Sequence, residues 1–132
     1  MERKIQMSST VSILPLSNVQ NETENYDLLL FRIAVSERID LENSYGLWAL
    51  LYALIAGGVK KILVDLSDLE YIDSSGISVL INVAKNMKTQ KGDIAFYGAS
   101  HDIRDIFKVV HLHGFIKLFS LEAEALSHFR YL

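Results

Sequence analysis

The residues best suited to chemistry lie in one short turn, Asp73-Ser74-Ser75-Gly76. An apolar run at 61–64 predicts a buried strand ahead of this turn, and apolar residues at helical spacing from Ile77 to Met87 predict a helix behind it. Aspartate and serine oxygens accept hydrogen bonds from the first free N–H groups of a helix, so the turn is expected to cap it. A serine hydroxyl at the positive end of a helix also tolerates an added negative group. The turn therefore predicts either a plain helix cap or a site of reversible charge.

A serine nucleophile is a second interpretation of the same turn. The nucleophile elbow of serine hydrolases needs Gly-x-Ser-x-Gly, whereas Ile72 lies two residues before Ser74 and Asp73 two before Ser75. The possible bases all lie downstream, at His101, His111, His113 and His128. Because no spacing places one of them beside Ser75, we expect a protein that is not an enzyme and has no catalytic residue.

Other polar clusters give weaker signals. His111 and His113 are alternate residues, which do not face each other on a helix, and no third metal ligand is spaced nearby. Gly57-Gly58 lacks the lysine and hydroxyl residue of a phosphate-binding loop. The paired carboxylates of Asp65 with Asp68 or Glu70 are most simply explained by a solvated loop. We therefore expect no metal site and no bound cofactor.

The composition limits the possible classes of protein. A chain of 132 residues, half of them hydrophobic and 22% charged, is expected to form one folded domain. The net charge of −3 without a basic block gives no support for nucleic-acid binding. Without cysteine the chain has no disulfide or thiolate site. The apolar run at 47–56 is half the length of a membrane span of about twenty residues, so we expect no membrane insertion. The expected location is the cytoplasm, a reducing compartment with which a chain without cysteine is compatible.

The pattern along the chain predicts an α/β fold. After a flexible N-terminus at 1–9, a single domain at 10–132 is expected, with a long loop at Ser17–Tyr26 between two opening strands. Strands joined through helices favour parallel neighbours, so the prediction is one mixed β-sheet covered by about four helices. The strands are expected at 10–16, 27–35, 61–64, 93–99 and 115–119, with Pro15 placing the first at a sheet edge.

The helices are expected to begin and end at specific residues. Asp40 is the candidate N-cap of a helix at 41–56 that Gly57-Gly58 ends, and Lys91-Gly92 is expected to end the helix after the turn. Ser100 or His101 should open a third helix with Ile103, Ile106, Phe107 and Val110 on one face. A terminal helix should align Leu121, Ala125, Phe129 and Leu132.

The helix at 41–56 is apolar nearly all round from Leu47 onward, so we expect it to be buried. An exposed face holding Trp48 or Tyr52 would instead indicate a homodimer.

The order of elements together with the turn resembles a STAS domain of the anti-sigma-factor-antagonist (anti-anti-sigma factor) family. The stretch at 62–77, Ile-Leu-Val-Asp-Leu-Ser-Asp-Leu-Glu-Tyr-Ile-Asp-Ser-Ser-Gly-Ile, is similar to that family's signature over its whole length. The likeness extends from about residue 27 to the C-terminus and includes Gly92, residues 103–107 and Gly114-Phe115.

The resemblance implies a phosphorylation switch in bacterial signal transduction. The family's phosphorylated serine corresponds to Ser75, with Asp73, Ser74 and Gly76 shaping the turn and Asp40 matching an acidic residue near it. The implied partners are an anti-sigma factor that is also a serine kinase, and a metal-dependent serine/threonine phosphatase. The unphosphorylated form would bind the anti-sigma factor and release the sigma factor, which regulates transcription by partner switching.

Two departures from the family concern Ser36, where glycine is common, and the long Ser17–Tyr26 connection. They affect the expected docking of the kinase more than the phosphorylation itself. Two alternatives stay open, namely a STAS scaffold subunit of a stress-signalling or transport complex that is never phosphorylated, and an enzyme with a Ser75 nucleophile.

Overall fold

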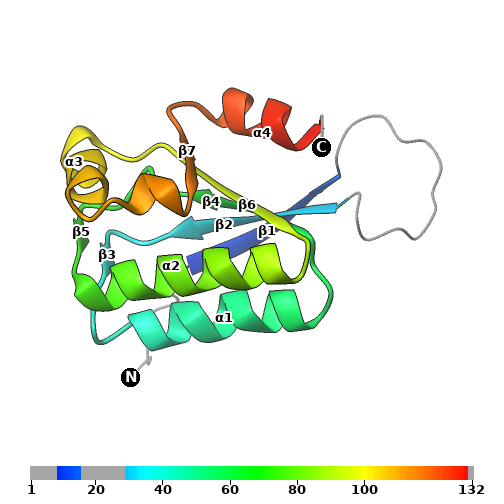
Figure 1. The fold of residues 1–132 in the computed structure, drawn as a ribbon, viewed down its shortest axis with the longest axis horizontal. Coiled ribbons are helices and arrows are strands. Elements are labelled where there is room, and N and C mark those ends of the chain that lie inside the picture. The colour runs from blue at the N-terminus through cyan, green and yellow to red at the C-terminus, as the bar shows by residue number, and fades with distance from the viewer. Residues whose placement is uncertain (1–8, 16–28, 131–132) are drawn as a thin grey trace, which may run out of the picture.

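The computed structural model describes residues 9–15 and 29–130, with side chains at 29–112 and 114–129 (Figure 1). The predicted Ser17–Tyr26 loop, residues 1–8 of the predicted flexible segment and Leu132 lie outside the described residues. The elements follow in the order β1 (Ser9–Pro15), β2 (Leu29–Val35), β3 (Arg38–Ile39), α1 (Ser44–Ala56), β4 (Lys61–Asp65), β5 (Tyr71–Ile72), α2 (Ser74–Thr89), β6 (Asp93–Tyr97), α3 (His101–Val109), the 3-10 helix η2 (Leu112–Gly114), β7 (Lys117–Phe119) and α4 (Glu122–Arg130).

A five-stranded mixed sheet, in the order β1-β2-β4-β6-β7, forms the centre of the fold. β1 pairs antiparallel with β2, and the other neighbouring strands are parallel. β1 lies at an edge of this sheet, as Pro15 predicts, because proline has no N–H for a second neighbour. β3 and β5 form a separate two-stranded parallel sheet.

Helices cover both faces of the main sheet, which confirms the predicted α/β fold class (Figure 1). On one face α1, α2 and α3 bury Leu51, Leu80 and Phe107 in a large cluster that includes Ile62 and Phe96 of the strands. On the other face α4 packs Ala125 and Phe129 against a second cluster, made with Leu30, Leu63, Ala95 and Tyr97. Successive strand residues alternate between the two clusters, as expected for a sheet buried on both sides.

Three predicted boundaries are wrong by a few residues. α1 begins at Ser44 and not at Leu41, with Asn43 and not Asp40 in the N-cap position, because residues 41–43 form a turn. β6 ends at Tyr97, since Gly98 turns the chain with a left-handed φ of 84°. β7 begins at Lys117, after η2 has used the residues around Gly114.

The end of α2 also differs from the prediction. The helix stops at Thr89, and the left-handed residue is Lys91, with φ of 62°, and not Gly92. Gly92 meets a different requirement, because a Cβ there would lie 2.9 Å from the Lys60 carbonyl oxygen. Glycine at 92 therefore permits a close approach of two backbone segments.

Ser100 caps α3 as predicted, because its hydroxyl accepts a hydrogen bond from the Ile103 N–H at 3.2 Å. In the terminal helix Ala125 and Phe129 are buried as predicted, but Leu121 precedes the helix and is 62% exposed. Val110 likewise follows α3 and is exposed, so the buried stripe of α3 ends at Phe107.

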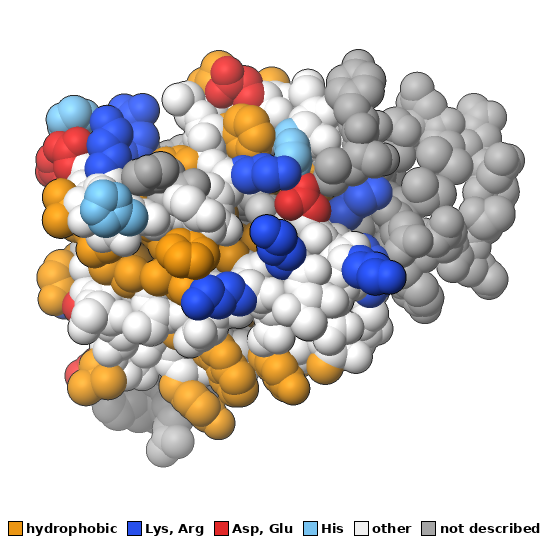
Figure 2. Space-filling view, in the orientation of Figure 1, with side chains coloured by type: hydrophobic (Ala, Val, Ile, Leu, Met, Phe, Trp, Pro, Cys, Tyr) orange, Lys and Arg blue, Asp and Glu red, His pale blue; other side chains and the backbone are white. Residues whose placement is uncertain are grey.

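One face of α1 is exposed, contrary to the expectation of full burial. Tyr45 and Tyr52 are 73% and 45% exposed, and Trp48 lies between them. The three rings stack in a row with centroid separations of 6.0 and 4.9 Å. Figure 2 shows hydrophobic side chains along this lower edge of the molecule. The opposite face of α1, which carries Leu47, Leu51 and Ile55, is in the core.

Within the described residues, every helix is too short or too polar to cross a membrane.

Candidate functional site: the turn at the start of α2

Asp73 is the N-cap of α2. Its backbone is extended, and its carboxylate Oδ1 accepts hydrogen bonds from the N–H groups of Ser75 at 2.9 Å and Gly76 at 3.2 Å. These two donors are among the four that a helix start leaves without a backbone partner. Ser74 and Ser75 are therefore the first two residues of the helix, and Asp73 alone supplies the side-chain cap.

The second oxygen of Asp73 holds a different part of the chain. Asp73 Oδ2 accepts a hydrogen bond from the Leu41 N–H at 3.2 Å, across 32 positions of sequence. The Asp73 N–H donates to the Ile39 carbonyl at 3.2 Å, next to the parallel pairing of Ile39 with Ile72. One residue thus caps α2 and holds the loop between β3 and α1 against the turn.

Gly76 permits this close packing. A Cβ at position 76 would lie 2.7 Å from Ile39 Cγ2 and Ile72 Cγ1 and 2.8 Å from the Ile39 carbonyl oxygen. Real side chains do not approach that closely, so an alanine here would have to push the β3 loop away. The turn needs glycine for reasons of space, since Gly76 has no left-handed backbone.

Asp40 lies in the same loop, one residue before the Leu41 contact. Its Oδ1 accepts a hydrogen bond from the Glu42 N–H at 3.0 Å, and its Oδ2 lies 3.3 Å from Arg38 Nε. Desolvation acts to raise the pKa of Asp40, but the hydrogen bonds from Arg38, Asn43 and Glu42 outweigh it and lower this pKa. Asp40 is therefore a stable negative charge near the turn, where it orders the residues before α1.

The two serines differ in exposure. Ser74 is exposed and Ser75 is partly exposed, so the Ser75 hydroxyl is not sealed in the core. The helix N-terminus beneath both carries partial positive charge from its N–H groups. This environment favours an anion at either hydroxyl, which is what a covalently attached phosphate would be.

Three neighbours of the turn were not predicted as site residues. Arg38 and Tyr71 pair in the register of β3 and β5, with the guanidinium carbon 4.4 Å from the ring centroid. Leu41 is 77% exposed and Tyr71 is 43% exposed, which places apolar surface beside the serines. Two-residue strands have no periodicity of their own, so the sequence offers no signal for this pairing.

Ser36, where the resembled family commonly has glycine, has a local role. Its hydroxyl donates to the Arg38 carbonyl at 3.1 Å and so supports the turn into β3.

The histidines proposed as possible bases have partners elsewhere. His101 pairs with Asp105 in α3 at 3.2 Å, and His128 of α4 bonds to Asp93 at the start of β6. His111 is exposed and adopts a left-handed backbone at the start of η2. The described residues contain no group of three or more potential ligands that could hold a metal ion.

Asp65 does not lie in a solvated loop with Asp68 and Glu70, as the sequence suggested. Its Oδ2 lies 3.1 Å from Arg32 Nη2, and the same guanidinium nitrogen also donates to the Tyr97 hydroxyl at 2.7 Å. Burial acts to raise the pKa of Asp65, but hydrogen bonds from Ser67 and Arg32 outweigh this and lower it overall. This cluster ties β2, β4 and β6 together on the α4 face.

Comparisons with known proteins agree with this architecture. The model of the STAS domain family matches residues 20–125. The chain is 28% identical over 81 residues to BtrV of Bordetella bronchiseptica, covering 61% of this chain and 67% of BtrV. It is 26% identical over 74 residues to the anti-sigma-B factor antagonist of Listeria monocytogenes, covering 56% of this chain and 63% of that protein. The matches thus span about two thirds of the length of these curated relatives.

The fold is similar to that of the anti-sigma factor antagonist SpoIIAA in its unphosphorylated form. The TM-score is 0.63 at 18% identity, covering 84% of this chain and 96% of SpoIIAA. The phosphorylated form of SpoIIAA, from Bacillus, gives a TM-score of 0.61 at 18% identity, with 81% and 95% of the two chains covered.

Proposed function

This chain belongs to the STAS domain family, and from the geometry of its α2 turn we propose that it is an anti-sigma factor antagonist switched by phosphorylation of Ser75. In the unphosphorylated state it binds an anti-sigma factor and releases a sigma factor. The phosphorylated state does not bind. The proposed location is the cytoplasm, where a kinase has access to ATP.

The observation that carries the proposal is the position of Ser75. It is the second residue of α2, it is partly exposed, and its N–H is already held by Asp73 Oδ1. A phosphate would add about −1.5 to −2 charges at pH 7 at the positive end of a helix. The charge therefore has a favourable site, and we expect the fold to survive the modification.

The same charge would alter the surface that a partner meets. The exposed side chains of Leu41 and Tyr71 offer apolar contact beside the turn, and Asp40 and Asp73 are already negative there. A dianion at Ser75 would force a partner to desolvate a phosphate or accept like-charge repulsion. A penalty of about 3 kcal/mol in the complex corresponds to roughly hundredfold weaker binding.

Two partners follow from the proposed switch. One is an anti-sigma factor that is also the serine kinase, and the other is a metal-dependent serine/threonine phosphatase that restores the hydroxyl. The proposal is supported by the similarity to SpoIIAA, which is known in both unphosphorylated and phosphorylated forms.

The test is capture of partners from lysate of the source organism by the full chain, with and without ATP, followed by mass spectrometry of the bait. We expect Ser75→Ala to retain the partner under both conditions, and Ser75→Glu to lose it. Ser78→Glu is the matched control, because Ser78 is exposed on the same helix about one turn later. Equal capture by Ser75→Ala and Ser75→Glu would refute the switch.

Two alternatives predict other results in the same experiment. A scaffold subunit would capture the same partners with and without ATP and would carry no phosphate. An enzyme with a serine nucleophile would be labelled at Ser75 by a fluorophosphonate probe, and Ser75→Ala would abolish the label.

We also propose that the exposed aromatic face of α1, formed by Tyr45, Trp48 and Tyr52, contacts a second copy of this chain. α1 has no charged residue between Ser44 and Ala56, so this face cannot form ion pairs with a charged partner. Its apolar surface can instead pack against the same surface of a second copy. Light scattering should detect a dimer that Tyr52→Glu dissociates. A monomer at every concentration would refute this contact.

A further inference from the structure

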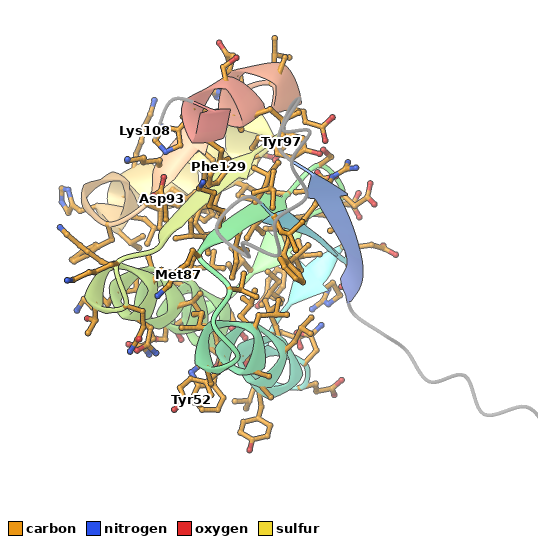
Figure 3. All side chains as sticks on the ribbon, turned by 90° about the vertical axis from the view of Figure 1, so that its right-hand side faces the viewer. Tyr52, Met87, Asp93, Tyr97, Lys108 and Phe129 are labelled. Atoms are coloured by element: carbon orange, nitrogen blue, oxygen red, sulfur yellow. The ribbon has the colours of Figure 1, made fainter. Side chains whose placement is uncertain are left out.

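A second concave site lies at the far end of α2 from the serine turn. It is an open cavity of about 960 Å³ between the C-terminal end of α2, the starts of β4, β6 and β7, and η2. Figure 3 looks onto this end of the molecule and labels Met87 and Asp93, which line the cavity. Its volume lies within the range of about 300–1,000 Å³ that is typical of small-molecule sites.

The rim of this cavity is strongly basic. Its lining includes five lysines and a single acid, Asp93, although the chain as a whole has a net charge of −3. Figure 2 shows Lys and Arg side chains over the middle and the right of the molecule in that view. The five lysines are Lys60, Lys61, Lys88, Lys91 and Lys117. Cations crowded around one hollow repel each other unless an anion lies among them.

Contacts within the fold account for only part of this charge. Lys60 Nζ donates to the Gln90 carbonyl at 2.7 Å and so gives a hydrogen bond to a backbone carbonyl at the C-terminal end of α2. Asp93 is engaged by His128 and lies 3.9 Å from Lys117 Nζ. Among the described residues, Lys88 and Lys91 have no carboxylate partner, and both are exposed. The lining therefore has more positive charge than its own acid can balance.

The interior of the cavity is apolar. Met87, Ile94 and Ile116 line it and are 1–6% exposed, so they form an apolar floor. The Phe115 ring, 50% exposed, also lines the cavity, with Lys85 Nζ 5.1 Å from its centroid. An apolar floor beneath a cationic rim suits a molecule with an apolar or aromatic body and an anionic group.

We propose that this cavity binds a small organic phosphate, with its phosphate at Lys88 and Lys91 and its apolar part against Met87, Ile116 and Phe115. The site is separate from the serine turn, because the two lie at opposite ends of α2. The concave shape favours a small molecule over a flat protein partner. The same chemistry is available from a free phosphate ester or from a phospholipid headgroup.

The test is an NMR titration of the ¹⁵N-labelled full chain with 1-naphthyl phosphate. We expect saturable shifts of the Gly92, Ile94 and Phe115 amides that weaken as salt is added. Inorganic phosphate, which lacks the apolar body, and 1-naphthol, which lacks the charge, should each bind more weakly. Co-sedimentation with phosphatidylcholine vesicles, with and without phosphatidylglycerol, distinguishes a lipid source from a free ester.

Variants show whether the lysines of the cavity are responsible. Lys88→Gln combined with Lys91→Gln should weaken binding about tenfold. Lys108→Gln should have no effect, because Lys108 is an exposed lysine of α3 that does not line the cavity. Phe115→Ala should weaken the binding of 1-naphthyl phosphate but not that of inorganic phosphate.

The absence of saturable shifts, or equal binding by the double variant and by Lys108→Gln, would overturn the proposal. Binding of a polyglutamate peptide in preference to naphthyl phosphate and vesicles would also overturn it, since the occupant would then be an acidic protein segment.

Discussion

Arg32 of β2 donates a hydrogen bond to the Tyr97 hydroxyl of β6 at 2.7 Å, across the intervening strand β4. The Tyr97 hydroxyl in turn donates to Glu122 Oε2 at 3.1 Å, at the start of α4. Arg32 Nε lies 3.2 Å from the same carboxylate oxygen, as an ion pair. This network attaches the start of α4 to the sheet, in addition to the His128–Asp93 contact and the apolar contacts of Phe129.

Tyr97→Phe should therefore destabilise the protein by about 1–3 kcal/mol, because it removes the buried hydroxyl that bonds to both Arg32 and Glu122. Urea unfolding followed by circular dichroism measures this difference. Tyr52→Phe is the matched control, since Tyr52 is 45% exposed on α1 and should change stability by only a few tenths of a kcal/mol. Equal stability of the two variants would show that the network contributes nothing.

Asp65 should make the stability depend on pH. Its pKa in the folded protein is lower than the ordinary value of 3.8, because the hydrogen bonds from Ser67 and Arg32 outweigh desolvation by burial. A depressed carboxylate pKa contributes stability above the unfolded-state pKa, and that stability is lost as the pH falls through the folded-state value. Asp65→Asn should thus be less stable than the parent at pH 7.

The difference between Asp65→Asn and the parent should shrink as the pH is lowered from about 5 towards 2. Thermal unfolding at a series of pH values measures it. A difference that stays constant over this range would mean that the Asp65 carboxylate is not stabilised as a charge.

Gly76→Ala should damage the turn by steric overlap. The new Cβ would meet Ile39 Cγ2 at 2.7 Å, so the loop after β3 must move, at a cost of about 1–3 kcal/mol. Gly46→Ala in α1 is the control, because a Cβ at position 46 meets nothing within 4 Å. That variant should gain up to about 1 kcal/mol from helix propensity. Melting curves that move in the same direction for both variants would contradict the packing argument.

The sequence predicts much of the fold because its signals are local. The alternation of apolar residues and the glycines and caps at element ends locate the main helices and strands, and parallel pairing follows from their order. The two-residue strands β3 and β5 were missed, because Arg38-Ile39 and Tyr71-Ile72 are too short to show a period. Burial was the expectation for α1 and an exposed face with Trp48 or Tyr52 the alternative; the sequence cannot decide between them, since α1 is apolar on all sides.

The site was predictable in its turn but not in its surroundings. Asp73 as a cap follows from residue type and position. Its bond to the Leu41 N–H joins residues 32 positions apart and depends on tertiary packing, so no local pattern indicates it. Asp65 was misjudged for the same reason, because its partner Arg32 lies 33 positions away.

Asp73→Ala tests whether one side chain holds both parts of the site. It removes the acceptors of the Ser75, Gly76 and Leu41 N–H groups, so we expect a loss of about 1–2 kcal/mol in unfolding free energy. Ser100→Ala is the matched control, because Ser100 caps α3 through the single Ile103 N–H and should cost less. In ¹H–¹⁵N spectra Asp73→Ala should shift the Leu41 amide as well as those of Ser75 and Gly76. An unshifted Leu41 amide beside shifted Ser75 and Gly76 amides would show that Asp73 caps α2 without holding the loop before α1.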